Sequence, residues 1–238
     1  MYSEFLIVIP LYNGEKTVLE VIEKILNQGF ENIVICDDYS TDNGLKLIKK
    51  SFPKINILEH EQNLGYGANQ KSLYDFAKNS AFKYVIMVHG DGQYTPELCR
   101  PIAEMLRTKI YVVVIASRII TSGAVKNGMP IYKYIANRTL TLLQNLVTNS
   151  KLSEYHTGFR AYSIDVLKEI NYQKFSNNFI FDNQFLLAII KNKFSIGEIS
   201  CPTIYSEESS SISFKNSLEY GFGILKESFN YLFIKDIK

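Results

Sequence analysis

The sequence has no tryptophan, only three cysteines and only six prolines among its 238 residues. Cys36, Cys99 and Cys201 are odd in number and far apart, and no Cys-x-x-Cys or Cys/His pair occurs. Neither a zinc site nor a disulfide framework is therefore indicated, and we expect buried free thiols in a reducing cytosol. The 13 glycines and six prolines also exclude a collagen-like or low-complexity chain.

Long hydrophobic runs are missing as well. No window approaches the ~20 apolar residues of a membrane-spanning helix. The first four residues carry no basic group, and the apolar run behind them ends at Pro10, so a signal peptide is not expected. These absences predict a cytoplasmic protein, or one attached peripherally to the cytoplasmic face of a membrane.

The chain also lacks an excess of charge. It has 26 Lys and Arg against 24 Asp and Glu, a formal net charge of +2, so it shows none of the basic excess typical of nucleic-acid binders. Hydrophobic residues make up 46% and charged residues 21%, as in globular proteins. What is plentiful is Tyr (16) and Phe (15).

Short β-branched runs alternate with segments of helical periodicity, which predicts an α/β fold with an open, mostly parallel sheet flanked by helices. Strands are expected over residues 5–9, 33–36, 55–58, 84–88, 111–116 and 195–200. Helices are expected over residues 17–28, after 41–42, and over 67–80, 131–147 and 185–190. No internal repeat or linker separates two domains.

Three polar clusters follow predicted strands, at residues 12–15, 37–42 and 89–93. In open α/β sheets, ligands bind beyond the carboxyl ends of the strands. We therefore expect the three clusters to form one site.

Asp91 and Gln93 could hold a metal ion, because carboxylate and amide oxygens suit Mg²⁺ or Mn²⁺. The alternative is a plain Asp-Gly turn. Asp37 and Asp38 could accept hydrogen bonds from a ribose or a base, or could serve as helix N-terminal charges. The glycines around Gly65 do not complete a dinucleotide-binding fingerprint.

Four basic residues are candidates for neutralising a diphosphate, although a solvated surface charge is the commoner use of each. They are Lys71, Arg118, Arg138 and Arg160. His89 and His156 adjoin the predicted site loops, where catalytic and structural roles both remain open. His60 is interpreted as a surface residue.

Ordered segments carry a resemblance to a known family. They are 8–15 (VIPLYNGE), 36–42 (CDDYSTD), 63–68 (NLGYGA), 91–93 (DGQ), 116–118 (ASR), 157–162 (TGFRAY) and 207–211 (EESSS). Together they resemble the family 2 glycosyltransferases with the GT-A fold, and most closely the branch of dolichyl- or polyprenyl-phosphate mannosyltransferase-like enzymes. The resemblance extends to about residue 213. It implies a nucleotide-sugar-binding half over 1–118 and an acceptor half over 119–213.

The resemblance further implies an inverting transfer of a hexose from a GDP- or UDP-sugar to a polyprenyl phosphate or a surface glycan. Asp91 and Gln93 would hold Mg²⁺ or Mn²⁺ against the diphosphate. The Arg residues named above would add positive charge near the phosphates or the acceptor, and Gly65 and Lys71 would belong to the donor site. The nucleoside pocket would be lined by Pro10, Tyr12, Glu15, Asp37 and Asp38.

Two departures from the family pattern stand out. His89 occupies the place of the first Asp of the usual Asp-x-Asp, and Asp182 is the nearest candidate for the base, with Glu154 and His156 as rivals. These departures leave open a catalytically inactive nucleotide-sugar-binding or scaffold subunit. A nucleotidyltransferase is disfavoured, because residues 10–15 hold one Gly and no basic residue.

Residues 214–238 predict a C-terminal amphipathic aromatic helix. Its apolar positions are Phe214, Leu218, Tyr220, Phe222, Ile224, Leu225, Phe229, Tyr231, Leu232 and Phe233. Such a face is expected to pack on the domain or on a second copy of the chain more often than on lipid. Lys215, Lys226, Lys235 and Lys238 are compatible with an anionic membrane surface.

Overall fold

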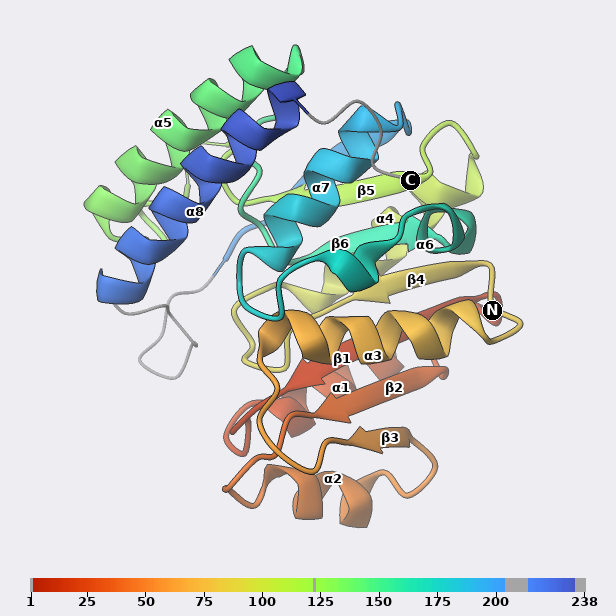
Figure 1. The fold of residues 1–238 in the computed structure, drawn as a ribbon. Coiled ribbons are helices and arrows are strands. Elements are labelled where there is room, and N and C mark those ends of the chain that lie inside the picture. Colours follow the sequence, from red (N-terminus) through yellow and green to blue (C-terminus); the bar gives the residue numbers. More distant parts are fainter. Residues whose placement is uncertain (1, 122, 204–213, 234–238) are drawn as a thin grey trace.

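The computed structural model describes residues 2–121, 123–203 and 214–233, and within them the strands form one sheet in the order β3-β2-β1-β4-β6-β5-β7 (Figure 1). Only β6 runs antiparallel to its neighbours, β4 and β5. The predicted open, mostly parallel α/β sheet is therefore confirmed. The strands are β1 (Phe5–Leu11), β2 (Ile33–Asp37), β3 (Asn56–Glu59), β4 (Tyr84–Met87), β5 (Val113–Ser117), β6 (Arg160–Ser163) and β7 (Ile196–Ser200).

Helices cover both faces of this sheet. They are α1 (Val18–Asn27), α2 (Gly44–Ser51), α3 (Tyr66–Lys78), α4 (Cys99–Arg107), α5 (Ile131–Thr148), α6 (Ile164–Glu169), α7 (Phe181–Lys191) and α8 (Phe214–Phe233), with 3₁₀ turns at Pro96–Leu98 and Tyr172–Lys174. Along β1, Phe5, Ile7 and Ile9 pack with α1 and α4, whereas Leu6 and Val8 pack with the α3, α6 and α7 side. The alternation of a strand buried on both faces thus builds two separate cores.

Helices α5 and α8, the two longest, stand apart from these layers (Figure 1). Helix α8 lies beside α5 and also touches α7 (Figure 1). Its Ile224 and Ser228 are buried in that contact. Residues 207–211, which belong to the family resemblance, and the residues Lys235 and Lys238 lie outside the described residues.

Three of these elements, α4, α6 and β6, were not predicted, and neither were the two 3₁₀ turns. Helix α4 begins directly after a 3₁₀ turn and carries Pro101 in its first turn. Strand β6 has only four residues, and it pairs with β4 across about 80 residues of sequence, with Tyr84 opposite Ser163. The buried positions of α4, Cys99, Ile102, Ala103 and Leu106, do have helical spacing, so the sequence carried a signal for this helix that the prediction missed. Strand β6 instead depends on pairing with distant strands, which local periodicity does not report.

Across the described helices, none is both long enough and apolar enough to span a bilayer.

Candidate active site

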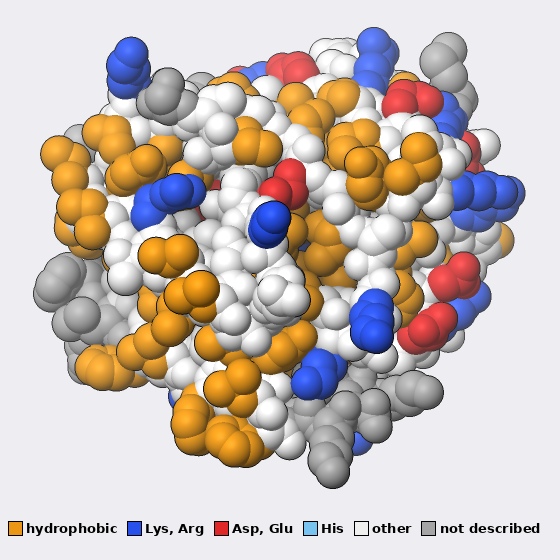
Figure 2. All heavy atoms as spheres, turned by 90° about the horizontal axis from the view of Figure 1, so that it is seen from above, with side chains coloured by type: hydrophobic (Ala, Val, Ile, Leu, Met, Phe, Trp, Pro, Cys, Tyr) orange, Lys and Arg blue, Asp and Glu red, His pale blue; other side chains and the backbone are white. Residues whose placement is uncertain are grey.

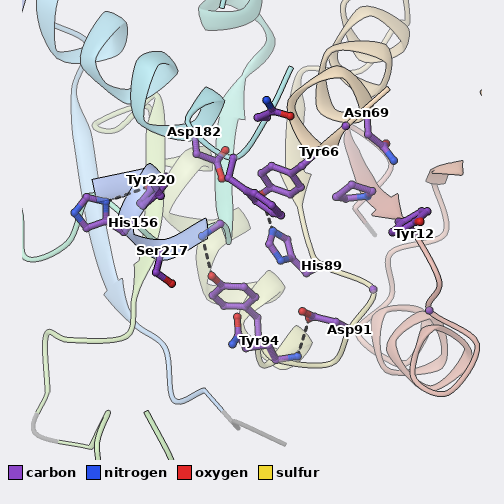
Figure 3. Close-up of a pocket in the computed structure, with 18 of the residues that line it drawn as sticks. Tyr12, Tyr66, Asn69, His89, Asp91, Tyr94, His156, Asp182, Ser217 and Tyr220 are labelled. Carbon is purple, nitrogen blue, oxygen red and sulfur yellow. Dashed lines mark hydrogen bonds between the residues drawn. The ribbon is translucent and has the colours of Figure 1, made fainter. Parts of the chain in front are cut away.

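A pocket of about 610 Å³ opens beyond the carboxyl ends of β1, β2 and β4 (Figure 3). Its lining includes members of all three polar clusters, together with side chains from α3, α5, α7 and α8. Ten of the residues singled out from the sequence line it: Pro10, Tyr12, Asp38, Gly65, His89, Asp91, Gln93, Arg118, His156 and Asp182. Five do not: Glu15, Asp37, Lys71, Arg138 and Arg160.

Asp38 holds the loop between β3 and α3 at one side of the pocket. One carboxylate oxygen accepts from the backbone N–H of Leu64 (2.9 Å) and the other from that of Gly65 (2.9 Å). His60 Nδ1 donates to the same carboxylate at 2.7 Å, and the His60 side chain is only 10% exposed. The interpretation of His60 as a surface residue was therefore wrong. Gly65 has φ +97°, a backbone conformation that favours glycine. The two hydrogen bonds to Asp38 hold the loop in this conformation.

Glu15 and Asp37 lie behind the pocket wall. The Glu15 carboxylate accepts from the backbone N–H of Asn43, which precedes α2, so it serves that helix terminus. Asp37 accepts from the backbone N–H of Ser40, and its other carboxylate oxygen is buried without a hydrogen-bond partner among the described residues. Both side chains support the loops rather than the cavity surface.

Three basic residues expected at a diphosphate lie elsewhere. The Lys71 ammonium donates to the carbonyls of Gln173 and Phe175 and to Asn177 Oδ1. Arg160 is completely buried and donates to the carbonyls of Tyr155, Thr157 and Asp182. Arg138 lies exposed on α5. The placement of these three corrects the expectation of phosphate ligands, because Lys71 and Arg160 already satisfy backbone oxygens and Arg138 points away from the cavity.

Arg118 and Lys133 instead form the cationic wall of the pocket. The Arg118 guanidinium binds the carboxylate of Glu154, which is completely buried, and donates to the carbonyl of His156. Burial and then the nearby charge of Arg118 lower the pKa of Lys133. Burial alone would raise the pKa of Glu154, but Arg118 and Asn137 outweigh it and lower that pKa. Because the Glu154 carboxylate balances the charge of Arg118, the net positive charge of this wall comes from Lys133, and it suits an anionic ligand.

A hydrogen-bond chain joins the two halves of the pocket (Figure 3). Tyr66 Oη donates to Asp182 Oδ2 at 2.8 Å, and Gln70 Nε2 donates to Asp182 Oδ1 at 3.0 Å. Burial and the Asp182 charge raise the pKa of Tyr66 well above its usual value, so its hydroxyl keeps its proton. That proton goes to Asp182, so His89 Nε2, 2.8 Å from the hydroxyl, is the donor to Tyr66.

Gly158 makes room for this chain. A Cβ at position 158 would lie 2.4 Å from His89 Nε2 and 3.2 Å from Tyr66 Oη. The Thr-Gly-Phe-Arg segment singled out in the sequence thus supplies space at Gly158 and a buried anchor at Arg160.

Asp91 and Gln93 remain the metal candidates. Asp91 Oδ1 accepts from the Gln93 backbone N–H at 3.0 Å, and both residues line the pocket. Among the described residues, no group of three or more His, Cys, Asp or Glu side chains is placed to hold a metal ion by itself. One carboxylate with an amide fits an Mg²⁺ or Mn²⁺ ion that takes most of its ligands from substrate phosphates and water.

Several lining or supporting residues were not singled out from the sequence, namely Tyr66, Asn69, Gln70, Lys133, Ser217 and Tyr220. Of these, Tyr66 and Asn69 stood in the predicted glycine loop and helix start. Lys133 lies about 40 positions after the last of the three polar clusters in the sequence. Their partners lie far away along the chain, so spacing alone carried no signal.

His156 is a buried neutral imidazole in the lining of the pocket. Burial lowers its pKa from 6.5 to about 3. Its Nδ1 lies 3.2 Å from Tyr220 Oη, and its Nε2 has no hydrogen-bond partner among the described residues. The ring is therefore uncharged near neutral pH.

We expect His156→Asn to reduce the loss of stability in acid. Between the unfolded pKa of 6.5 and the folded pKa of about 3, the unfolded chain binds a proton that the folded chain does not. Stability therefore falls as pH falls through this window, by about 2 kcal/mol at pH 5 from this one group. Urea unfolding at pH 7 and pH 5 measures it. The loss on acidification should be smaller in the variant by that amount, and equal losses in the two proteins would contradict the assignment.

Comparison with known proteins places the chain in a family. The model of "Glycosyl transferase family 2" matches residues 6–171. The UDP-N-acetylglucosamine–dolichyl-phosphate N-acetylglucosaminyltransferase of Methanococcus voltae is 28% identical over 222 residues, covering 85% of this chain and 86% of the relative.

Solved structures agree on the fold. Glucosyl-3-phosphoglycerate synthase from Mycobacterium tuberculosis, in complex with Mn²⁺, UDP and glucosyl-3-phosphoglycerate, superposes with a TM-score of 0.69 at 14% identity, covering 98% of this chain and 81% of that one. The same enzyme has been solved with Mg²⁺ and UDP, also at a TM-score of 0.69, with 15% identity and coverage of 98% and 80%. The fold is thus the GT-A fold, and the chain belongs to glycosyltransferase family 2 and is a glycosyltransferase.

Proposed function

We propose that the protein transfers a hexose from a nucleotide-diphosphate sugar to a polyprenyl phosphate, with inversion at the anomeric carbon. The observation that supports this most strongly is the charge pattern of the pocket. Arg118 and Lys133 form a cationic wall on the acceptor side, while Asp182 already accepts hydrogen bonds from Tyr66 and Gln70. The relative in Methanococcus voltae is named for a dolichyl-phosphate acceptor, which has the same chemistry.

The donor would occupy the nucleotide side. Tyr12 is 55% exposed at the pocket edge and offers a ring on which a base can stack, beside the loop that Asp38 holds. Asp91 and Gln93 would hold Mg²⁺ or Mn²⁺, which when bound supplies positive charge for the diphosphate leaving group. The neighbouring structures with UDP and either metal are consistent with this arrangement.

The acceptor chemistry follows from the groups on the other side. A hydroxyl acceptor needs a base to remove its proton, whereas a phosphate oxygen is already anionic. Asp182 is held by two donors, and Glu154 is completely buried against Arg118, so neither is placed as a base. Burial lowers the pKa of His156, the third candidate, to about 3, which makes its imidazole a weak base. In the proposed step, a phosphate oxygen forms the bond to the anomeric carbon as the bond to the diphosphate oxygen breaks.

A lipid-linked acceptor also requires the pocket to meet a membrane. We therefore extend the proposal to peripheral attachment on the cytoplasmic side. A growing surface glycan is the alternative acceptor, but it would present hydroxyls to a wall of cations.

His89 favours one competing function. It stands where related enzymes have an Asp, so a subunit that binds nucleotide-sugars without turning them over is the second candidate. Such a protein would bind donor and form no product.

A thermal-shift screen tests the donor assignment. We expect one of the UDP-, GDP-, CDP- and dTDP-sugars to raise the melting temperature in Mn²⁺ and to do so much less with a chelator, because a ligand that binds only the folded state stabilises it by mass action. Equal shifts with and without chelator would contradict the metal assignment. No shift with any donor would contradict both the enzyme and the binding subunit.

A further inference from the structure

Helix α5 buries polar side chains and exposes apolar ones, the reverse of an ordinary surface helix. Its buried side chains include four polar ones, Asn137, Thr141, Gln144 and Thr148. Its exposed side chains include Ile131, Ile135, Leu142 and Leu146, the last being 74% exposed. At 100° per residue these four apolar side chains share a stripe about 60° wide, opposite the buried polar one. A surface helix normally places its polar face in water, so this face is built for something other than water.

Helix α8, which lies beside α5, also exposes apolar side chains (Figure 1). Phe222, Leu225, Phe229, Leu232 and Phe233 are exposed, while Ile224 and Ser228 are buried. The exposed apolar side chains of the two helices are here called the α5–α8 face, and hydrophobic side chains gather on this side of the molecule, on the left of Figure 2. Singly exposed apolar residues are normal, but so many on two adjacent helices mark an interaction site.

The α5–α8 face continues into the pocket. Tyr132 and Ala136 of α5 are exposed and also line the cavity, and Ser217 and Tyr220 of α8 line it from the other helix. Whatever occupies this face therefore lies next to the lining of the pocket.

The charge around the face is of one sign on the α5 side. Residues 119–153 contain four basic residues, Lys126, Lys133, Arg138 and Lys151, and no acidic one. Arg138 lies between Ile135 and Leu142 on the exposed side of α5. Helix α8 adds Lys226, with Glu219 and Glu227 as its acidic groups. Basic side chains beside an apolar stripe match the headgroup region of an anionic bilayer.

We propose that the α5–α8 face docks the protein in the interface of an anionic membrane, with both helices lying in the plane of the surface and the pocket mouth toward the headgroups. The purpose of this docking rests on the proposed function: a docked protein would let a lipid-linked phosphate reach Arg118 and Lys133 without leaving the bilayer. The docking itself needs neither nucleotide nor acceptor.

Flotation of the full chain with vesicles tests the docking separately from catalysis. The vesicles contain phosphatidylcholine alone or with phosphatidylglycerol, and no polyprenyl phosphate or nucleotide. We expect binding to vesicles that contain phosphatidylglycerol, weakened at high salt. The variant Leu142→Ser/Leu146→Ser/Phe229→Ser should bind at least about a hundredfold less, since three side chains leave the interface. The matched control is Ile110→Ser, which removes an equally exposed apolar side chain outside the face.

The outcomes separate the two proposals. The docking would be overturned, and the function left standing, if the triple variant bound vesicles as well as the wild type. The same conclusion would follow if the wild type bound no vesicles but still transferred sugar to a water-soluble short-chain prenyl phosphate. Docking without any transfer would overturn the function alone. A dimer in sedimentation that the triple variant abolishes, with no vesicle binding, would assign the face to a second copy and also overturn the docking.

Discussion

Asp91→Asn is expected to reduce the rate of sugar transfer on the order of a thousandfold, because it removes the charge that would hold Mg²⁺ or Mn²⁺ against the leaving diphosphate. The substitution keeps the side-chain oxygen that accepts from the Gln93 backbone N–H, so the turn should persist. The other pocket carboxylates cannot take over, since Asp38 holds the loop at Gly65 and Asp182 is held by Tyr66 and Gln70. Initial rates at saturating donor and Mn²⁺ measure the loss.

Asp165→Asn serves as the control for this prediction. Asp165 is exposed at the start of α6, and it does not line the pocket. Its variant should transfer sugar at the wild-type rate. An Asp91→Asn protein as active as this control would remove Asp91 from the metal site.

Arg118→Met is expected to lower the free energy of unfolding by about 3–5 kcal/mol, because it leaves the buried carboxylate of Glu154 without its cation. Asn137 Nδ2 still donates to Glu154 at 2.8 Å, but a neutral donor does not replace a charge. Urea unfolding near pH 7, where Glu154 is ionised in the folded protein, measures the change.

The double variant Arg118→Met/Glu154→Gln separates the two causes. If the unpaired charge is responsible, the double variant should recover most of the lost stability, since no buried charge remains. A single variant within about 1 kcal/mol of the wild type would show that Glu154 is not held as a buried ion pair.

The sequence was a good guide wherever a pattern was local. The β-branched runs predicted the parallel strands, and the polar clusters after them converge on one pocket because parallel strands end at the same edge. Asp91 and Gln93 lie in that pocket as a consequence of this topology.

The sequence was a poor guide to which polar groups were already satisfied. Arg160 and Lys71 carry charges suited to phosphate, but backbone carbonyls occupy both. Those that bind Lys71 belong to a distant segment, whereas Arg160 binds the carbonyls of Tyr155, Thr157 and Asp182. Tyr66 meets Asp182 across 116 positions, and His60 meets Asp38 across 22, so neither contact follows from spacing. The inverted polarity of α5 was likewise invisible, because periodicity gives an apolar stripe but not the side on which it lies.

Transfer to polyprenyl phosphate compared with the matching polyprenol is the most direct test of the proposed activity. The purified chain is given the donor selected by thermal shift, Mn²⁺ and either acceptor, and lipid-linked sugar is quantified by mass spectrometry. We expect product with the phosphate at a rate at least about a hundredfold above that with the alcohol, which lacks the charge for Arg118 and Lys133 and still needs a base. Equal or faster transfer to the alcohol, or no product with either acceptor despite donor binding, would contradict a polyprenyl-phosphate glycosyltransferase.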